Sequence, residues 1–162
     1  MFDAIITPLV AIAAISAGLM AGVYFAFSGF IMRSFDQLGA LPATDAMNAI
    51  NEVILRSWFM VLFFGSTLLY AVIFVLALVD TDVPGQWNLL LTGAIYVLGM
   101  FACTALFNVP LNNRLVKAAG DAQIRSGLWM HYRKTWTRWN HLRTVCSLAA
   151  LVLGMHYLAY YG

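Results

Sequence analysis

Long apolar segments alternate with two more polar segments along the chain, and this pattern predicts four membrane-spanning helices. A helix needs about 20 predominantly apolar residues to cross the hydrocarbon core of a bilayer. Four segments meet this requirement, at about residues 5–32, 58–79, 87–107 and 142–161. We therefore expect an all-α fold, an integral membrane four-helix bundle that forms a single domain over residues 1–162.

The two polar segments, residues 33–57 and 108–141, have a helical pattern of their own. The stretch LPATDAMNAINEVILRSW begins with a proline in the first turn and runs without a breaker into the second span. It places Asn48 and Asn51 on one stripe, with Glu52 at its edge. Glu52 is the only glutamate in the sequence, and it fits either a hydrated surface position or a carboxylate at the mouth of the bundle, paired with an arginine. We expect amphipathic helical extensions on one side of the membrane.

The second polar segment ends in WMHYRKTWTRWNHLRT, residues 129–144, which a helical projection divides into two faces. One face is an aromatic stripe that ends in two polar residues: Trp129, Tyr132, Trp136, Asn140 and Arg143. The opposite face is basic and carries His131, Lys134, Arg138 and His141. The aromatic stripe fits either an interfacial belt that packs between helices or the wall of a binding pocket.

Composition and charge agree with a membrane protein and indicate its orientation. Only 10% of the residues are charged and 62% are hydrophobic, whereas soluble domains carry roughly 25% charged residues. All nine Lys and Arg residues lie in or next to the two polar segments. The positive-inside rule then places both segments in the cytoplasm and both termini outside, in a bacterial inner (plasma) membrane or in an organelle membrane of the same sidedness. The basic face suits anionic lipid head groups, and nothing indicates a nucleic-acid partner.

Small residues in the first span predict a close helix contact. Gly18, Gly22 and Ala26 repeat every four residues, a spacing that lets helix backbones approach, either inside the bundle or at a homo-oligomer seam. We therefore expect Gly22→Leu to disrupt packing and Gly85→Leu, in a short loop, to be tolerated. Tyr24, on the other side of this helix, is expected to look into the bundle.

The third span ends in FNVPLNNRL, where Pro110 is expected to bend or stop the helix. Asn108 and Asn112 fit two interpretations: they satisfy backbone groups freed by the proline, or they line a polar pocket at the depth of Asn140 and Arg143.

No cofactor motif is present, so we expect neither a metal nor a cofactor. Cys103 and Cys146 stand alone, without CxxC spacing. His131 and His141 lie ten residues apart, about 15 Å along a helix, and do not make a convincing metal site.

Four stretches together resemble the anthrone oxygenase-like family of small four-helix membrane proteins: YFAFSGFIM, AMNAIN, FNVPLNNRL and W-x2-Y-x3-W-x2-WNHLRT-x2-SLAA. They cover essentially the whole chain in the expected order, and the third and fourth are specific. Many bacterial members of this family are labelled only as a domain of unknown function. For the fungal polyketide-pathway members, the resemblance implies oxidation of an anthrone to an anthraquinone by molecular oxygen, without metal or flavin.

Such chemistry needs an aromatic pocket, a base, and positive charge near the developing oxyanion. The candidate walls are Trp129, Tyr132, Trp136 and Trp139, with Asn48, Asn51, Asn108 and Asn112 as further binding residues. Arg143 would stabilise the enolate or superoxide together with Asn140, and Glu52 or His131 would act as the base. We expect an oxygenase for a lipophilic anthrone- or quinone-like molecule. The alternative is a non-catalytic membrane protein that binds a lipid or small hydrophobic ligand, or supports a partner complex.

Overall fold

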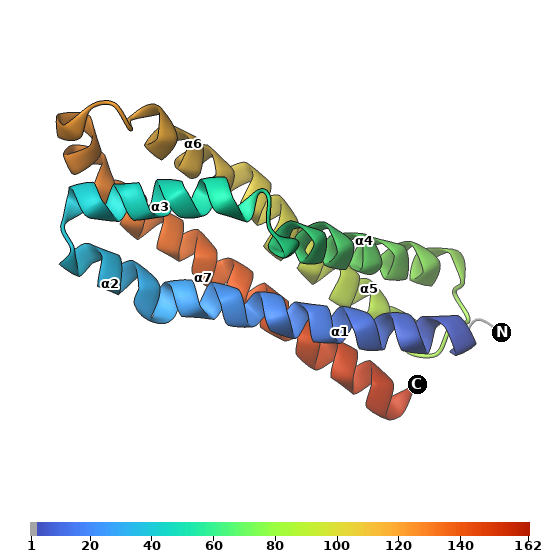
Figure 1. The fold of residues 1–162 in the computed structure, drawn as a ribbon. Helices are drawn as coiled ribbons and strands as arrows, with labels where there is room; N and C mark the ends of the chain where they lie inside the picture. Colours follow the sequence, from blue (N-terminus) through green and yellow to red (C-terminus); the bar gives the residue numbers. More distant parts are fainter. Residues whose placement is uncertain (1–2) are drawn as a thin grey trace.

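The computed structural model describes residues 3–162, and this part of the chain folds into helices without strands (Figure 1). The first rod consists of α1 (Asp3–Ala26), a π-helical turn η1 (Phe27–Ile31) and α2 (Met32–Gln37). It is followed by α3 (Ala40–Ile54) and α4 (Trp58–Val79). The third rod consists of α5 (Gln86–Tyr96), the π-helical turns η2 (Val97–Ala102) and η3 (Thr104–Asn108), and α6 (Val109–Lys117), and α7 (Ala122–Tyr160) completes the chain. The prediction of an all-α fold is confirmed.

Four helices are long and apolar enough to cross a membrane, which makes this an integral membrane protein. The 22 residues of α4 measure about 33 Å at 1.5 Å per residue, close to the thickness of a hydrocarbon core. The other three candidate spans have 33, 32 and 39 residues and therefore extend beyond the bilayer. Their extensions gather at the end of the bundle where α2 turns into α3 and α6 turns into α7, opposite the chain termini (Figure 1). We call this end of the bundle, where α2, α3, α6 and the start of α7 lie, the basic end.

The third span ends later than the sequence predicts. Pro110 does not stop the third span, because the helix continues from η3 through α6 to Lys117. Likewise α7 is one helix of 39 residues, so the fourth span and most of the preceding polar segment form a single element.

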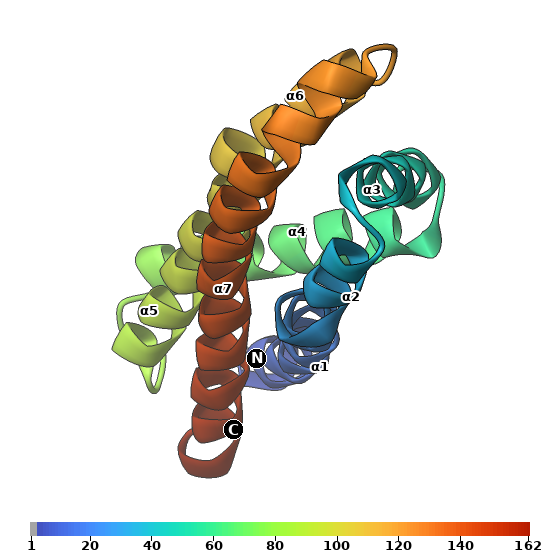
Figure 2. The same cartoon turned by 90° about the vertical axis from the view of Figure 1, so that its left-hand side faces the viewer.

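Helix α7 is the central element, with α1 packed along one side and α5 along the other (Figure 2). Small residues allow α7 to approach α1 and the third rod, and the closest approaches occur at glycines outside the predicted stripe of α1. A methyl group at Gly154 would lie 3.1 Å from the β-carbon of Ala14, and one at Gly99 would lie only 2.2 Å from the sulfur of Cys146. The close approach of helices therefore depends on glycines of α7 and η2.

The expected packing of the small-residue stripe of α1 inside the bundle holds for Gly18, where a methyl group would lie 3.5 Å from Leu151 of α7, and is wrong for Gly22. Gly22 is exposed, and a methyl group there would meet nothing within 4 Å. The expectation for Gly85 is also wrong, since its φ is +68° and a β-carbon would lie 2.6 Å from the ring of Tyr161. The homo-oligomer seam along Gly18, Gly22 and Ala26 stays a prediction.

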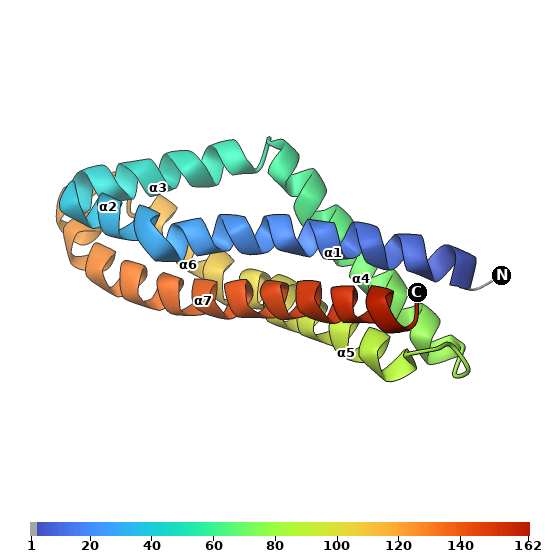
Figure 3. The same ribbon diagram turned by 90° about the horizontal axis from the view of Figure 1, so that it is seen from below.

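Two ion pairs hold the basic end together, and both involve α7. Arg125 pairs with Asp45 of α3, and its Nε donates to Thr44 Oγ1 at 2.8 Å. Arg133 pairs with Asp36 of α2, which also accepts a 3.1 Å hydrogen bond from the indole nitrogen of Trp129. These contacts fix the start of α3 against α7, while its other end diverges from α1 towards α4 (Figure 3).

Candidate functional site

A cavity of about 910 Å³ lies beneath α3, between α1, the start of α4, the third rod and α7. Its volume is in the range of about 300–1,000 Å³ that is typical of small-molecule sites. Apolar and aromatic side chains make up most of the lining, among them Phe59, Phe63, Phe64, Phe101 and Trp136. The polar side chains of the lining come from α3, α6, η3 and α7: Asn48, Asn51, Glu52, Thr104, Asn112, Asn113 and Arg143.

All three π-helical turns contribute to this region. Phe27 of η1, Phe101 of η2 and Thr104 of η3 line the cavity. A π-helical turn inserts one extra residue into a helix and changes the direction of the side chains that follow, and such turns frequently occur at functional sites.

Arg143 supplies a buried positive charge at the cavity wall. Its side chain is 5% exposed, and its Nη2 donates to Asn140 Oδ1 at 2.6 Å while its Nη1 donates to Thr104 Oγ1 at 3.3 Å. The guanidinium carbon lies 4.3 Å from the ring centroid of Tyr24 and 5.1 Å from that of Trp136. These are cation–π distances, so aromatic faces stabilise part of the charge.

Arg143 has no carboxylate partner among residues 3–162, where the ion pairs are Arg125–Asp45 and Arg133–Asp36. Its Nε is buried and has no hydrogen-bond acceptor in the described part of the chain. A guanidinium stays charged, and a buried charge without a counter-ion is costly. The arrangement therefore leaves a donor and a net positive charge for an anionic group.

Asn140 holds this arginine in place. It is fully buried on α7, where its Nδ2 donates to the backbone oxygen of Tyr24 at 2.6 Å and to the hydroxyl of Ser28. Its side-chain oxygen faces Arg143 instead of the cavity. Asn140 thus connects Arg143 to α1.

The helical projection of α7 is confirmed, because the five residues of the aromatic stripe are buried and the four residues of the basic face are exposed. Only Trp136 of the four aromatic candidates lines the cavity. Trp129 bonds to Asp36, and Trp139 stacks on Phe107 with ring centroids 3.8 Å apart. The aromatic stripe therefore divides into Trp136, which lines the cavity, and Trp129, which packs between α7 and α2.

Some of the asparagines line the cavity, whereas Tyr132 and Asn108 lie outside its lining. Tyr132 does not line it, but its hydroxyl donates to Asn112 Oδ1 at 2.9 Å, and Asn112 does line it. Asn108 is buried outside the lining and donates to the backbone oxygen of Trp136 at 3.3 Å. Asn48 Oδ1, on α3, is buried without a partner in the described chain, which leaves an unpaired acceptor beside the cavity, whereas the side chain of Asn51 interacts with Tyr132.

The two candidate bases lie in different places. Glu52 is exposed and lines the cavity, and it forms no ion pair with Arg143 or Arg56 in the described residues. His131 is exposed on the outer face of α7, about 100° around the helix from Tyr132. This corrects the expectation that His131 serves as a base in the cavity.

Thr104 and Phe101 are site residues that the sequence interpretation missed. Thr104 accepts from Arg143, and it lies four residues before Asn108, so its position on the same helix face was the available signal. For Phe101 no signal was available, because a phenylalanine in an apolar span is ordinary. Within residues 3–162, no group of three or more His, Cys, Asp or Glu could hold a metal ion.

Comparison with known proteins places the chain in a family. A family model described as anthrone oxygenase matches residues 58–153, more than half of the chain. The matched region includes α4, the third rod and the part of α7 that carries Trp136, Asn140 and Arg143. No curated protein and no solved structure matches the chain. The chain belongs to the anthrone oxygenase family.

Proposed function

We propose that this protein is a membrane oxygenase that oxidises a lipophilic anthrone- or quinone-like aromatic with molecular oxygen, without a metal or organic cofactor. The observation that carries the proposal is Arg143, a buried guanidinium without a carboxylate partner in the described chain, at the wall of a largely apolar cavity. Membership of the anthrone oxygenase family supports an oxygenase role.

The lining suits a flat aromatic that carries a few oxygen substituents. Phe63, Phe101 and Trp136 offer ring surfaces against which fused rings can pack. The unpaired oxygen of Asn48 would accept a hydrogen bond from a phenolic hydroxyl.

The reaction begins when a proton leaves the methylene carbon opposite the anthrone carbonyl, which gives an enolate with negative charge on oxygen. Arg143 stabilises this charge, and a preorganised donor of this kind is typically worth about 2.7–4 kcal/mol. The enolate gives one electron to oxygen, and the resulting radical and superoxide combine at the same carbon. After protonation, the hydroperoxide loses water and leaves a second carbonyl. One oxygen atom of O2 enters the quinone and the other leaves as water.

Glu52 is our candidate for the base, because it is the one acidic side chain among the described residues that line the cavity. Its carboxylate would accept the methylene proton and return a proton to the peroxide. As it is exposed, it can also exchange protons with water. Asn140 is a positioning residue, since it reaches the site through Arg143.

The test is turnover by the purified protein in lipid nanodiscs that have been treated with a chelator. A dihydroxylated anthrone is added under isotope-labelled oxygen gas, and quinone formation, oxygen uptake and label are measured. We expect catalysed formation of quinone with one labelled atom and one O2 consumed per quinone. Anthrones also oxidise in air, so empty nanodiscs are the reference, and a rate no higher than theirs would refute the proposal.

A second candidate function is non-catalytic binding of a lipid or a small hydrophobic ligand, which the predominantly apolar lining favours. Mass spectrometry of ligands that copurify with the protein separates the two. A phospholipid in the cavity of a protein that shows no turnover would support this second function.

A further inference from the structure

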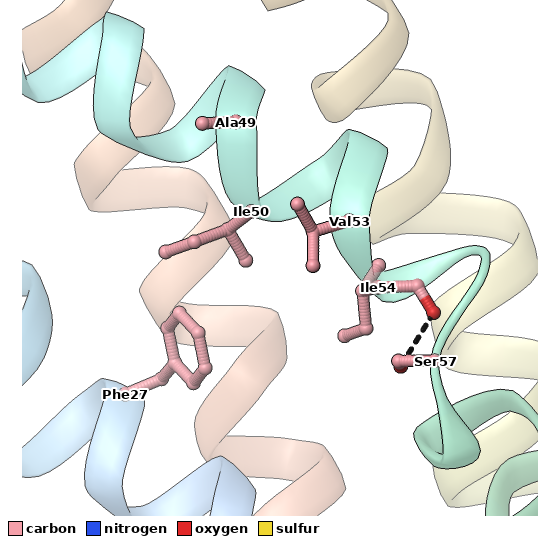
Figure 4. A pocket seen from close by; sticks show the side chains of 6 residues that line it. All are labelled: Phe27, Ala49, Ile50, Val53, Ile54 and Ser57. Atoms are coloured by element: carbon pink, nitrogen blue, oxygen red, sulfur yellow. Dashed lines mark hydrogen bonds between the residues drawn. The ribbon is translucent and has the colours of Figure 1, made fainter.

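An apolar depression of about 370 Å³ lies beside the cavity, between η1 and the end of α3 (Figure 4). Its lining consists of Phe27, Ala49, Ile50, Val53, Ile54 and Ser57. In Figure 4 the ring of Phe27 points towards α3, and the side chain of Ile50 points towards this ring. The depression is almost purely hydrophobic, which distinguishes it from the polar parts of the cavity wall.

The depression and the cavity lie next to each other and share part of their lining. Phe27, Ala49, Ile50 and Ile54 line both of them. Val53 and Ser57 line the depression but not the cavity. The shared side chains therefore lie where the two spaces meet, and the exposed Val53 lies at the outer opening of the depression.

This opening lies at the membrane surface. Trp58 is the first residue of α4, directly after Ser57, and its side chain is 85% exposed. Because α4 is about as long as the hydrocarbon core is thick, its first turn lies where acyl chains meet head groups, a depth at which tryptophan is enriched. Val53, 67% exposed, presents apolar surface at the same place. A lipid-facing position accounts for this exposure.

The opposite side of the cavity has a different character. Its lining on α6 includes Asn112 and the exposed Asn113, which lie in the extension beyond the apolar span. The cavity therefore has polar residues on its α6 side, whereas the depression at the end of α3 is apolar.

We infer that the depression between η1 and α3 is the port through which the lipophilic aromatic enters the cavity directly from the bilayer, with Phe27 and Ile50 as its inner constriction. The inference rests on the proposed function, because it takes the substrate class from it. A lipophilic aromatic concentrates in the membrane, and a lateral port spares it the transfer through water that apolar surface disfavours.

Val53→Trp tests the port, because Val53 lines the depression and not the cavity, so the substitution fills the outer opening and replaces no residue of the cavity lining. The matched control is Val61→Trp, which places the same side chain at a valine of α4 that is 60% exposed and lines neither space. The probe is a fluorescent hydroxyanthraquinone with a long alkyl chain that holds it in the bilayer of nanodiscs. Its association and dissociation rates are measured by rapid mixing.

An obstructed port slows entry and exit alike and leaves the equilibrium unchanged. We expect Val53→Trp to lower both rate constants about tenfold with an unaltered Kd, and Val61→Trp to alter neither. Damage to the cavity would instead change the Kd. Wild-type rates in Val53→Trp would overturn the inference and leave the oxygenase proposal intact.

The remaining outcomes are also decisive. A wild-type protein that binds the quinone but oxidises no anthrone would refute the oxygenase proposal, while the rate constants would still decide on the port. A wild-type protein that does not bind the quinone would overturn both. A phospholipid that copurifies with the wild type but not with Val53→Trp, at unchanged quinone rates, would assign the depression to an acyl chain and overturn the port.

Discussion

Replacement of Arg143 by leucine should separate catalysis from stability. The side chain contributes the positive charge at the cavity wall, and its loss should lower kcat by about 10²- to 10³-fold, the usual effect of removing one preorganised donor to an oxyanion. We expect the protein still to fold and insert, because leucine is apolar and the site is buried.

The cost in stability can be worked out from the contacts of Arg143. Thr104 keeps a partner when the arginine is removed, because its hydroxyl donates to the backbone oxygen of Met100 at 2.7 Å. Asn140 Oδ1 loses its donor, and one unpaired buried acceptor costs about 1–3 kcal/mol. The loss of the guanidinium also removes the desolvation cost of an unpaired charge, which offsets part of this. A modest fall in thermal stability should therefore accompany a large fall in turnover.

The assay combines anthrone turnover in nanodiscs with thermal unfolding in detergent. Arg138→Leu is the matched control, since Arg138 lies on the exposed face of the same helix, and it should keep the wild-type kcat. Arg143→Lys retains a charge but not the planar fork and should recover part of the activity. Wild-type kcat in Arg143→Leu, or equal losses in Arg143→Leu and Arg138→Leu, would refute the role of this charge.

Three further predictions concern packing, orientation and recognition. Gly99→Ala places a methyl group 2.2 Å from a sulfur of α7 and should cost about 1–3 kcal/mol, whereas Gly22→Ala meets open space and should not lower the melting temperature; equal melting temperatures would contradict this. Cysteines introduced at Asp82 and Gln123 should react with an impermeant maleimide on opposite sides of the membrane, Asp82 from outside, and labelling of Gln123 from outside would reverse the orientation. Asn48→Leu removes an unpaired acceptor and should raise the KM for a hydroxylated anthrone about threefold to tenfold with kcat retained, so an unchanged KM would exclude Asn48 from binding.

The bundle itself could be predicted from the sequence, because its signals are local. Twenty apolar residues in a row require a helix in a membrane, since every backbone group must be satisfied within the segment. The same holds for the two faces of α7, where Arg143 is buried and Arg138 is exposed as the 100° periodicity requires. The family resemblance is confirmed by the match over residues 58–153, which contains the third and fourth motifs.

The candidate site was predictable only in part. Arg143, Trp136 and Asn48 were identified, since a polar or aromatic residue on a buried helix face is a visible signal. The hydrogen-bond acceptors of Arg143 could not be predicted in the same way. Glu52 is the obvious acidic partner in the sequence, but in the structure Arg143 donates to Asn140 and Thr104. Which acceptor a side chain reaches depends on the depth and rotation of neighbouring helices, which the sequence of one helix does not contain.

The sequence by itself determined the number of spans, the helical character of the polar segments and the inward face of α7, since all of these follow from the spacing of residues along one element. Only the tertiary structure decided which glycines allow close contact, as the exposed Gly22 and the buried approach of Gly99 to α7 show. It also decided that α3 diverges from α1 and leaves a cavity beneath it (Figure 3). The reason is that crossing angles and distances between helices result from many side-chain contacts between segments far apart in the chain, and no single stretch encodes their sum.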